Sequence, residues 1–198
     1  MSLKAIRTAL WVVVAAVVAV GVAWFAFAPR EGALTTANIG GPFTLTDQNG
    51  ATVTEAALKG HPTAMFFGYT FCPDVCPTTL SDITVWLQQL GAGGDRLKVY
   101  FVTVDPERDT QAAMASYLQA FDPRIVGLTG TRPAIDAMLK EFRVYARKVD
   151  GKDGAPYTMD HTAGVYLLDS NANFVGTVDY QEKPDVALAK LKRLIGET

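Results

Sequence analysis

A chain of 198 residues with 49% apolar composition is long enough to bury one sizeable hydrophobic core, and no repeat of fixed period divides it. Its 18 basic and 20 acidic residues give a formal net charge of −2, so no basic surface argues for binding to nucleic acid. The only two cysteines are Cys72 and Cys76, which excludes a framework of several disulfides. We therefore expect one globular domain whose cysteines are available for chemistry.

The first predicted element is an apolar segment near the N-terminus. No charged residue occurs from Thr8 to Pro29, and as a helix this segment would be roughly 33 Å long, enough to cross a bilayer. Lys4 and Arg7 precede it, which places the N-terminus in the cytoplasm and the rest of the chain on the periplasmic side of an inner membrane. A cleaved signal peptide ending at Ala26-Phe27-Ala28 is the alternative, but the apolar run is longer than usual for one. We predict a single-pass anchor at residues 1–29.

A polar linker at residues 30–38 and a folded domain at residues 39–198 are predicted to follow. The domain begins with a hairpin, because Phe43 to Thr46 alternates apolar and polar residues before the turn Asp47-Gln48-Asn49-Gly50, and Ala51 to Val53 continues as a second strand.

Strands and helices then alternate. The apolar run Thr63 to Phe67 predicts a buried strand leading to Cys72, and helical spacing from Leu80 to Leu90 predicts a helix with Pro77 at its first position. The alternation is typical of βαβ units, so we predict an α/β fold with a thioredoxin-like mixed sheet flanked by helices. The other predicted elements are strands at 97–104, 125–128, 144–149, 162–168 and 174–178, helices at 110–121, 133–142 and from Pro184, and a loop at 151–160.

The cysteines lie in the segment Phe71-Cys72-Pro73-Asp74-Val75-Cys76-Pro77, at the predicted turn from strand to helix. We expect Cys76 near the N-cap, where backbone N–H groups and the helix dipole favour a thiolate. A proline after each cysteine stiffens the loop, which suits metal binding or a reversible disulfide. Burial of both cysteines as small apolar residues is the less favoured alternative.

His161 is the predicted third ligand. It stands at the start of a predicted strand, which a thioredoxin-like sheet can bring beside the cysteine loop. Two thiolates and one imidazole suit Cu(I), because soft sulfur ligands select it, whereas structural zinc usually has four protein ligands. Asp74 and Asp160 flank these residues and are candidates to orient His161 or to adjust the thiolates; the alternative for each is a solvated loop carboxylate.

The segment Asp105-Pro106-Glu107-Arg108-Asp109-Thr110 lies between a predicted strand and a predicted helix. Asp109 is a natural N-cap for that helix and Asp105 a turn former. We favour this structural interpretation over a surface that faces a partner.

Three motifs together resemble the Sco/SenC family. They are Gly68-Tyr69-Thr70-Phe71-Cys72-Pro73-Asp74-Val75-Cys76-Pro77-Thr78-Thr79-Leu80, Val104-Asp105-Pro106-Glu107-Arg108-Asp109-Thr110 and Asp160-His161-Thr162-Ala163. The resemblance implies a membrane-tethered, thioredoxin-fold protein that binds copper as Cu(I) or Cu(II) through Cys72, Cys76 and His161. It also implies a role in assembling the dinuclear copper centre of cytochrome c oxidase subunit II, with another periplasmic protein as a candidate copper donor. Phe71 and Gln111 depart from residues common in the family, and neither is at a ligand position.

The sequence favours a copper chaperone over two kinds of enzyme. A thiol-disulfide oxidoreductase, which would keep the target's cysteines reduced or sense redox state, is the main alternative, with Cys72 and Cys76 as its redox disulfide. That class usually has two residues between its cysteines, whereas here there are three, and it needs no equivalent of His161. A peroxiredoxin would resemble Pro-x-x-x-Thr-x-x-Cys, but Met65 and Tyr69 occupy those positions before Cys72.

Overall fold

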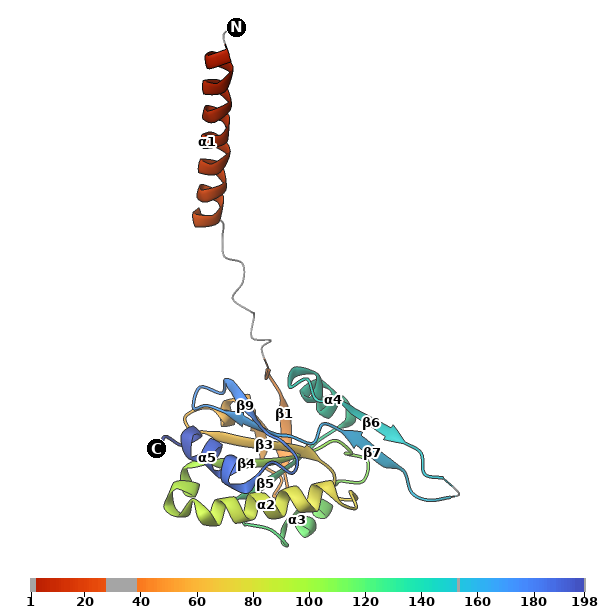
Figure 1. Ribbon diagram of the computed structural model, residues 1–198. Helices are drawn as coiled ribbons and strands as arrows, with labels where there is room; N and C mark the ends of the chain where they lie inside the picture. The colour runs from red at the N-terminus through yellow and green to blue at the C-terminus, as the bar shows by residue number, and fades with distance from the viewer. Residues whose placement is uncertain (1–2, 28–38, 153, 198) are drawn as a thin grey trace. The chain divides into compact units, whose positions relative to one another are not determined.

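The computed structural model describes residues 3–27, 39–152 and 154–197 (Figure 1). The chain divides into two units, Met1–Ala37 and Asn38–Thr198, and the first contains one helix of 25 residues, α1 (Leu3–Phe27). Within the described residues, no helix combines the length and the apolar character that crossing a membrane requires. The predicted linker at 30–38 and the end of the predicted anchor, including Ala28 of the alternative cleavage site, lie outside the described residues.

The second unit is built on a seven-stranded mixed sheet with strand order β2-β1-β5-β4-β3-β8-β9. β4 pairs in parallel with both β3 and β5, and the other neighbours in the sheet are antiparallel. The sheet therefore combines βαβ units with hairpins at its two edges, as the sequence predicts. Its strands are β1 (Thr44–Asp47), β2 (Thr52–Thr54), β3 (Thr63–Gly68), β4 (Lys98–Thr103), β5 (Ile125–Thr129), β8 (Val165–Leu168) and β9 (Phe174–Val178).

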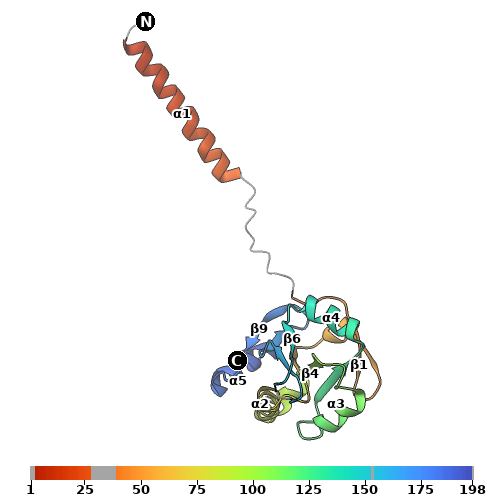
Figure 2. The same ribbon diagram turned by 90° about the vertical axis from the view of Figure 1, so that its right-hand side faces the viewer.

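Helices cover both faces of the sheet, with α4 on one side and α2 and α3 on the other (Figure 2). Phe66 of β3 stacks on Phe101 at 5.8 Å between ring centroids, and Phe101 in turn meets Tyr117 of α3 at 6.0 Å. Phe67 points to the opposite face and meets Phe142, at the end of α4, at 5.6 Å. The helices are α2 (Val75–Gln89), α3 (Gln111–Leu118), α4 (Arg132–Glu141) and α5 (Pro184–Leu194), with short 3-10 helices at Glu55–Leu58 and Gly91–Arg96.

This arrangement encloses β3 on all sides. All six residues of β3 are buried, as expected for a strand with neighbours on both edges and helices on both faces. The strand leads directly into the cysteine loop. The predicted thioredoxin-like mixed sheet flanked by helices is confirmed.

Two predicted helix starts are wrong. α2 begins at Val75, so Pro77 is its third residue and not its first, while Cys76 lies in the first turn, near the N-cap Asp74 as predicted. Proline is accepted at the third position of the helix, because the first four N–H groups have no partner within a helix. In α3 the N-cap is Thr110, whose hydroxyl accepts a hydrogen bond from the N–H of Ala113, and Asp109 is not the cap.

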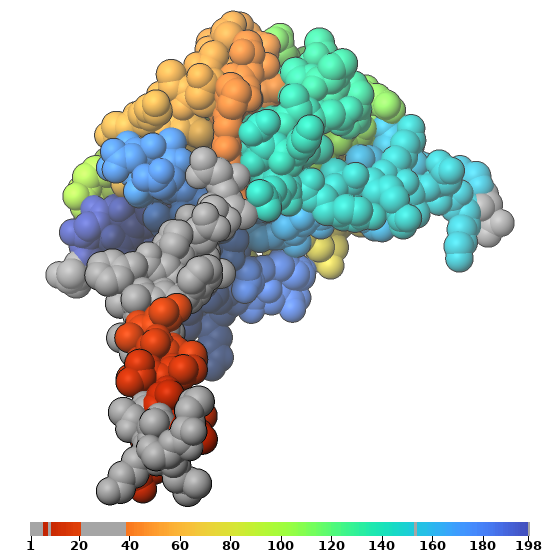
Figure 3. Space-filling model, turned by 90° about the horizontal axis from the view of Figure 1, so that it is seen from above, coloured from red at the N-terminus to blue at the C-terminus, as the bar shows by residue number. Residues whose placement is uncertain are grey.

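The predicted loop at 151–160 is also partly wrong. Its end forms β7 (Thr158–His161), which pairs antiparallel with β6 (Ala146–Val149) in a separate two-stranded sheet. This hairpin, drawn in cyan, extends outward from the domain in Figure 3. His161 therefore ends a strand, and the strand predicted to follow it begins later, at Val165.

Candidate metal centre

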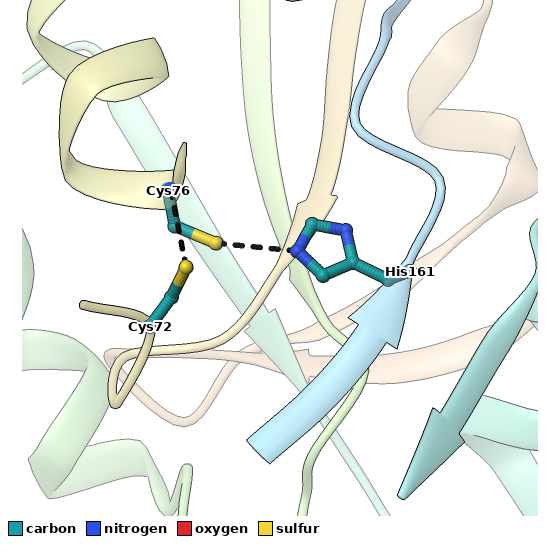
Figure 4. Close-up of side chains that lie close together, drawn as sticks. All are labelled: Cys72, Cys76 and His161. Atoms are coloured by element: carbon teal, nitrogen blue, oxygen red, sulfur yellow. Dashed lines mark hydrogen bonds between the residues drawn. The ribbon is translucent and has the colours of Figure 1, made fainter. Parts of the chain in front are cut away.

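Cys72, Cys76 and His161 converge at the end of β3 (Figure 4). Cys72 lies in the turn after β3, Cys76 in the first turn of α2, and His161 at the end of β7. One ligand atom from each residue lies within 4.8 Å of the other two, and Cys76 Sγ is 3.5 Å from His161 Nε2. The structure thus brings together the three residues that the sequence predicts as a set.

Backbone contacts fix the two sulfur atoms. The N–H of Cys72 donates to the carbonyl of Tyr69 at 3.3 Å, and the N–H of Cys76 donates to Cys72 Sγ at 3.4 Å. Gly68 allows the close approach of α2, since a Cβ at that position would lie 2.8 Å from Cys76 Sγ. The cysteine loop is therefore held in a defined shape by the end of β3 and the start of α2.

The orientation of His161 is set by its own neighbours. Its Nδ1 lies 2.9 Å from the carbonyl of Thr162, which can only accept, so Nδ1–H is the donor and Nε2 presents its lone pair to the cysteines. The rings of Phe66 and Tyr69 meet the imidazole edge to face, at centroid distances of 6.2 and 5.9 Å. The tautomer and the ring plane are both those required of a ligand.

The two thiols differ in exposure and in acidity. Cys76 is fully buried, whereas Cys72 is partly exposed. A hydrogen bond from Cys76 lowers the pKa of Cys72, and backbone N–H groups add to that shift while burial opposes it. The hydrogen bond to Cys72 and burial raise the pKa of Cys76, so the prediction of a thiolate at Cys76 is wrong and the thiolate lies at Cys72. One proton is thus retained on Cys76 beside the Cys72 thiolate, and a metal ion bound by both sulfur atoms would displace it.

Comparison with known proteins identifies the family of this chain. Residues 31–196 match the sequence model of SCO1/SenC. The chain belongs to the SCO1/SenC family. The structure of Bradyrhizobium japonicum ScoI with copper bound is similar, with 52% identity and a TM-score of 0.73 over 79% of this chain and 99% of that one.

Two further SCO1/SenC relatives show the same likeness. The structure of yeast Sco1 with copper bound has 34% identity and a TM-score of 0.74, covering 81% of this chain and 90% of that one. A SCO2-like protein from Rickettsia felis is 36% identical over 155 residues, which are 78% of this chain and 76% of the relative. The resemblance to the Sco/SenC family is confirmed.

The carboxylates of Asp74 and Asp160 do not orient the histidine. The Nδ1 partner of His161 is the Thr162 carbonyl, and the exposed Asp160 carboxylate instead lies 3.5 Å from Arg147 Nη2. Asp74 is exposed, and its contribution to the pKa of Cys72 comes from a backbone hydrogen bond. A backbone carbonyl carries no residue-specific signal, so its role cannot be found from composition.

Asp109 supports the cysteine loop in a way that the sequence interpretation missed. Its buried carboxylate accepts hydrogen bonds from the hydroxyls of Thr70 and Thr103, both at 2.6 Å, and from the N–H of Thr70. Burial raises the pKa of Asp109, although the threonine hydrogen bonds oppose that shift. The sequence did contain a signal for this role. Thr70 follows one strand and Thr103 ends the neighbouring parallel strand, and polar side chains meet at such strand ends.

The donor set fits a soft metal ion. Two thiolate sulfurs and one imidazole nitrogen form the cluster, and three donors suit a low-coordinate ion better than structural zinc, which usually takes four. The partial exposure of Cys72 leaves the site accessible to a ligand from another molecule.

Proposed function

We propose that this chain is a copper carrier that holds one ion, as Cu(I) or Cu(II), between Cys72, Cys76 and His161. The observation that carries the proposal is the convergence of two sulfur atoms and one imidazole nitrogen within 4.8 Å. The copper in the structures of B. japonicum ScoI and yeast Sco1 supports the choice of metal. By family resemblance, the carrier serves cytochrome c oxidase assembly at the dinuclear copper centre of subunit II, and another periplasmic protein donates the copper.

The geometry suits transfer as well as binding. The sulfur and nitrogen positions exist before the metal arrives, so little reorganisation is needed to bind copper. An incoming ligand reaches the ion from the side of the partly exposed Cys72, while the buried Cys76 keeps its contact until the end. Exchange one ligand at a time then moves the ion without releasing it into solution.

The test is an anaerobic titration of the reduced full chain, in detergent, with Cu(I) against a competing chelator. The expected result is one tightly held equivalent. The matched control is the same protein with both thiols alkylated, which should retain none. If the unmodified chain holds no more copper than the alkylated control, the carrier function is wrong.

A thiol-disulfide reductase is the second candidate, and the unequal thiols favour it. The Cys72 thiolate would attack a disulfide of the target and release one target thiolate; Cys76 would then displace the second, leaving a Cys72–Cys76 disulfide and a reduced target dithiol. Metal-free reduced chain mixed with an oxidised copper-binding domain of subunit II tests this. Thiols that appear on the target without copper would support the reductase, whereas copper that moves only to a target already reduced would support the carrier.

We also propose that residues 1–29 anchor the protein in the inner membrane, with its N-terminus in the cytoplasm, residues 30–38 as a linker, and the copper-binding domain at 39–198 in the periplasm. Support comes from the uncharged run between Thr8 and Pro29 and from Lys4 and Arg7 before it. Membranes washed at alkaline pH should retain the full chain, and protease added to spheroplasts should digest its domain. Release of the chain by the wash, with no shortened N-terminus, would contradict the anchor.

A further inference from the structure

The β6–β7 hairpin that carries His161 lies outside the main sheet. β6 and β7 form a two-stranded sheet of their own, and a two-stranded hairpin alone is at best marginally stable in water. Met159 is the buried residue of β7, while Thr158 and Asp160 are exposed. The place of His161 therefore depends on side chains that join the hairpin to the rest of the domain.

Arg108 makes the closest such connection. Its Nη1 donates to the carbonyl of Tyr157 at 2.9 Å, and its Cζ lies 3.6 Å from the centroid of the Tyr157 ring. Tyr157 directly precedes β7. The guanidinium thus holds both the backbone and the ring of the residue that leads into the strand of His161.

The same guanidinium also faces the cysteine loop. Its Cζ lies 4.8 Å from the ring centroid of Phe71, the residue before Cys72, and 5.6 Å from that of Tyr69. The Tyr69 ring in turn stands perpendicular to the imidazole of His161. Arg108 therefore lies between the two halves of the metal centre and contacts both.

Asp105 fixes Arg108 in this position. The carboxylate is 1% exposed and accepts from Arg108 Nε at 2.5 Å, and the Tyr157 hydroxyl donates to it at 3.0 Å. Arg108 Nη2 is buried and has no hydrogen-bond partner among the residues that the structure describes, so aromatic ring faces are the surroundings that offset its desolvation. A guanidinium that is only 16% exposed and has one incompletely satisfied nitrogen indicates a role beyond one surface ion pair.

We propose that Arg108 is a positioning residue for His161: it ties the β6–β7 hairpin to the cysteine loop, so that the imidazole stands beside the sulfur atoms before copper binds. Of the two tests of this inference, the first rests on the proposed copper-binding function. Arg108 itself does not ligate the metal. Its loss leaves both thiols in place and lets the hairpin move away from them.

The first test measures Cu(I) affinity of the full chain in detergent, by anaerobic competition, as a double-mutant cycle. Arg108→Ala should weaken binding by about 10- to 100-fold, the usual cost of losing a group that orients a ligand. In a His161→Ala background the same substitution should have no further effect, because its target is already absent. Arg108→Lys keeps the charge but not the planar fork, and should restore part of the affinity.

The matched control is Arg124→Ala, which removes another partly buried arginine with two ion pairs, next to the start of β5 and away from the site. It should leave copper affinity unchanged. If Arg108→Ala has no effect, or weakens binding equally with and without His161, the positioning role is overturned. Should Arg108→Ala fail to fold, Tyr157→Ala tests the same contact, with Tyr157→Phe as the variant that keeps the ring over the guanidinium.

The second test needs no copper and so separates this inference from the proposed function. In the metal-free chain, Arg108→Ala should speed amide hydrogen exchange in Thr158–His161 by about 10-fold, as loss of one charge-assisted hydrogen bond predicts, while exchange in β3 stays unchanged. Equal exchange in the hairpin of both proteins overturns the inference even if copper binds. Failure of the unsubstituted chain to bind copper overturns the carrier function alone.

Discussion

The cysteine half of the proposed metal centre and its histidine half are held by different forces. Cys72 and Cys76 lie between a strand whose six residues are all buried and a helix that buries Leu80, Ile83 and Leu87. His161 ends a strand with one buried residue and depends on contacts of a guanidinium, a tyrosine and a carboxylate. The cysteines thus lie between two elements held by apolar burial, whereas the strand of His161 has only Met159 in the core and depends more on polar and cation–π contacts. The sulfur geometry should therefore survive loss of the histidine half.

The largest effect should come from breaking the cysteine half. Cys76→Ser keeps the shape of a fully buried side chain but replaces a soft thiolate with a hydroxyl. The free energy of metal binding at a structural zinc site with four ligands is ~10–16 kcal/mol. If the ligands share it, one thiolate contributes roughly 4 kcal/mol, so the Cu(I) affinity of Cys76→Ser should fall by about 1000-fold. Anaerobic chelator competition measures the change. Affinity within tenfold of the unsubstituted chain would show that Cys76 is not a ligand.

Removing the histidine half should have a smaller effect. His161→Ala leaves both thiolates, so Cu(I) affinity should fall by about 100-fold, or roughly 3 kcal/mol on the same scale. The two cysteines should still close to a disulfide on mild oxidation, because β3 and α2 hold them independently of the hairpin. Mass spectrometry after alkylation checks that point. Loss of disulfide formation would mean that the halves are not separable.

The inequality of the two thiols predicts an unusual pH dependence. Since the hydrogen bond with Cys76 lowers the pKa of Cys72, the Cys72 thiolate fraction should stay nearly constant between pH 6 and 8, whereas an ordinary thiol loses about 10-fold in ionisation per unit of falling pH. Cys76→Ala removes that hydrogen bond but keeps the backbone ones, so its slope should shift toward the ordinary value. Iodoacetamide alkylation rates measure both. A tenfold slope per pH unit in the metal-free unsubstituted chain would be incompatible with the described site.

The smallest effect is expected from an exposed contact of the hairpin. Lys148 Nζ lies 3.2 Å from Glu107, but both side chains are about half exposed, at 47% and 55%. Exposed ion pairs contribute about 0–1 kcal/mol, so Lys148→Gln should change Cu(I) affinity by less than about 3-fold. A loss as large as that expected for Arg108→Ala would show that the hairpin is held by its outer charges and not by the guanidinium.

The fold was predictable from sequence where local pattern and tertiary environment agree. The buried strand before Cys72 is a continuous apolar run, and α5 begins at Pro184 as its proline suggests. β7 was missed because Thr158 to His161 contains one apolar side chain, and pairing with β6 makes it a strand. Long-range pairing of this kind leaves no local periodicity to detect.

The site was predictable to the extent that it lies in one motif. Cys72 and Cys76 are four residues apart in the chain, so their approach follows from one turn and one helix start. The approach of His161 depends on the topology of the whole domain. Arg108 could not be assigned a role, because its partners Phe71 and Tyr157 come from segments that only the fold brings together.

The three-ligand site is tested by the copper-edge X-ray absorption spectrum of the anaerobically loaded, reduced full chain, recorded beside that of His161→Ala. A three-ligand site built from both halves predicts two sulfur neighbours and one nitrogen neighbour, and the loss of only the nitrogen in the variant. Sulfur neighbours alone in the unsubstituted chain, with a spectrum identical to that of His161→Ala, would show that His161 is not a ligand.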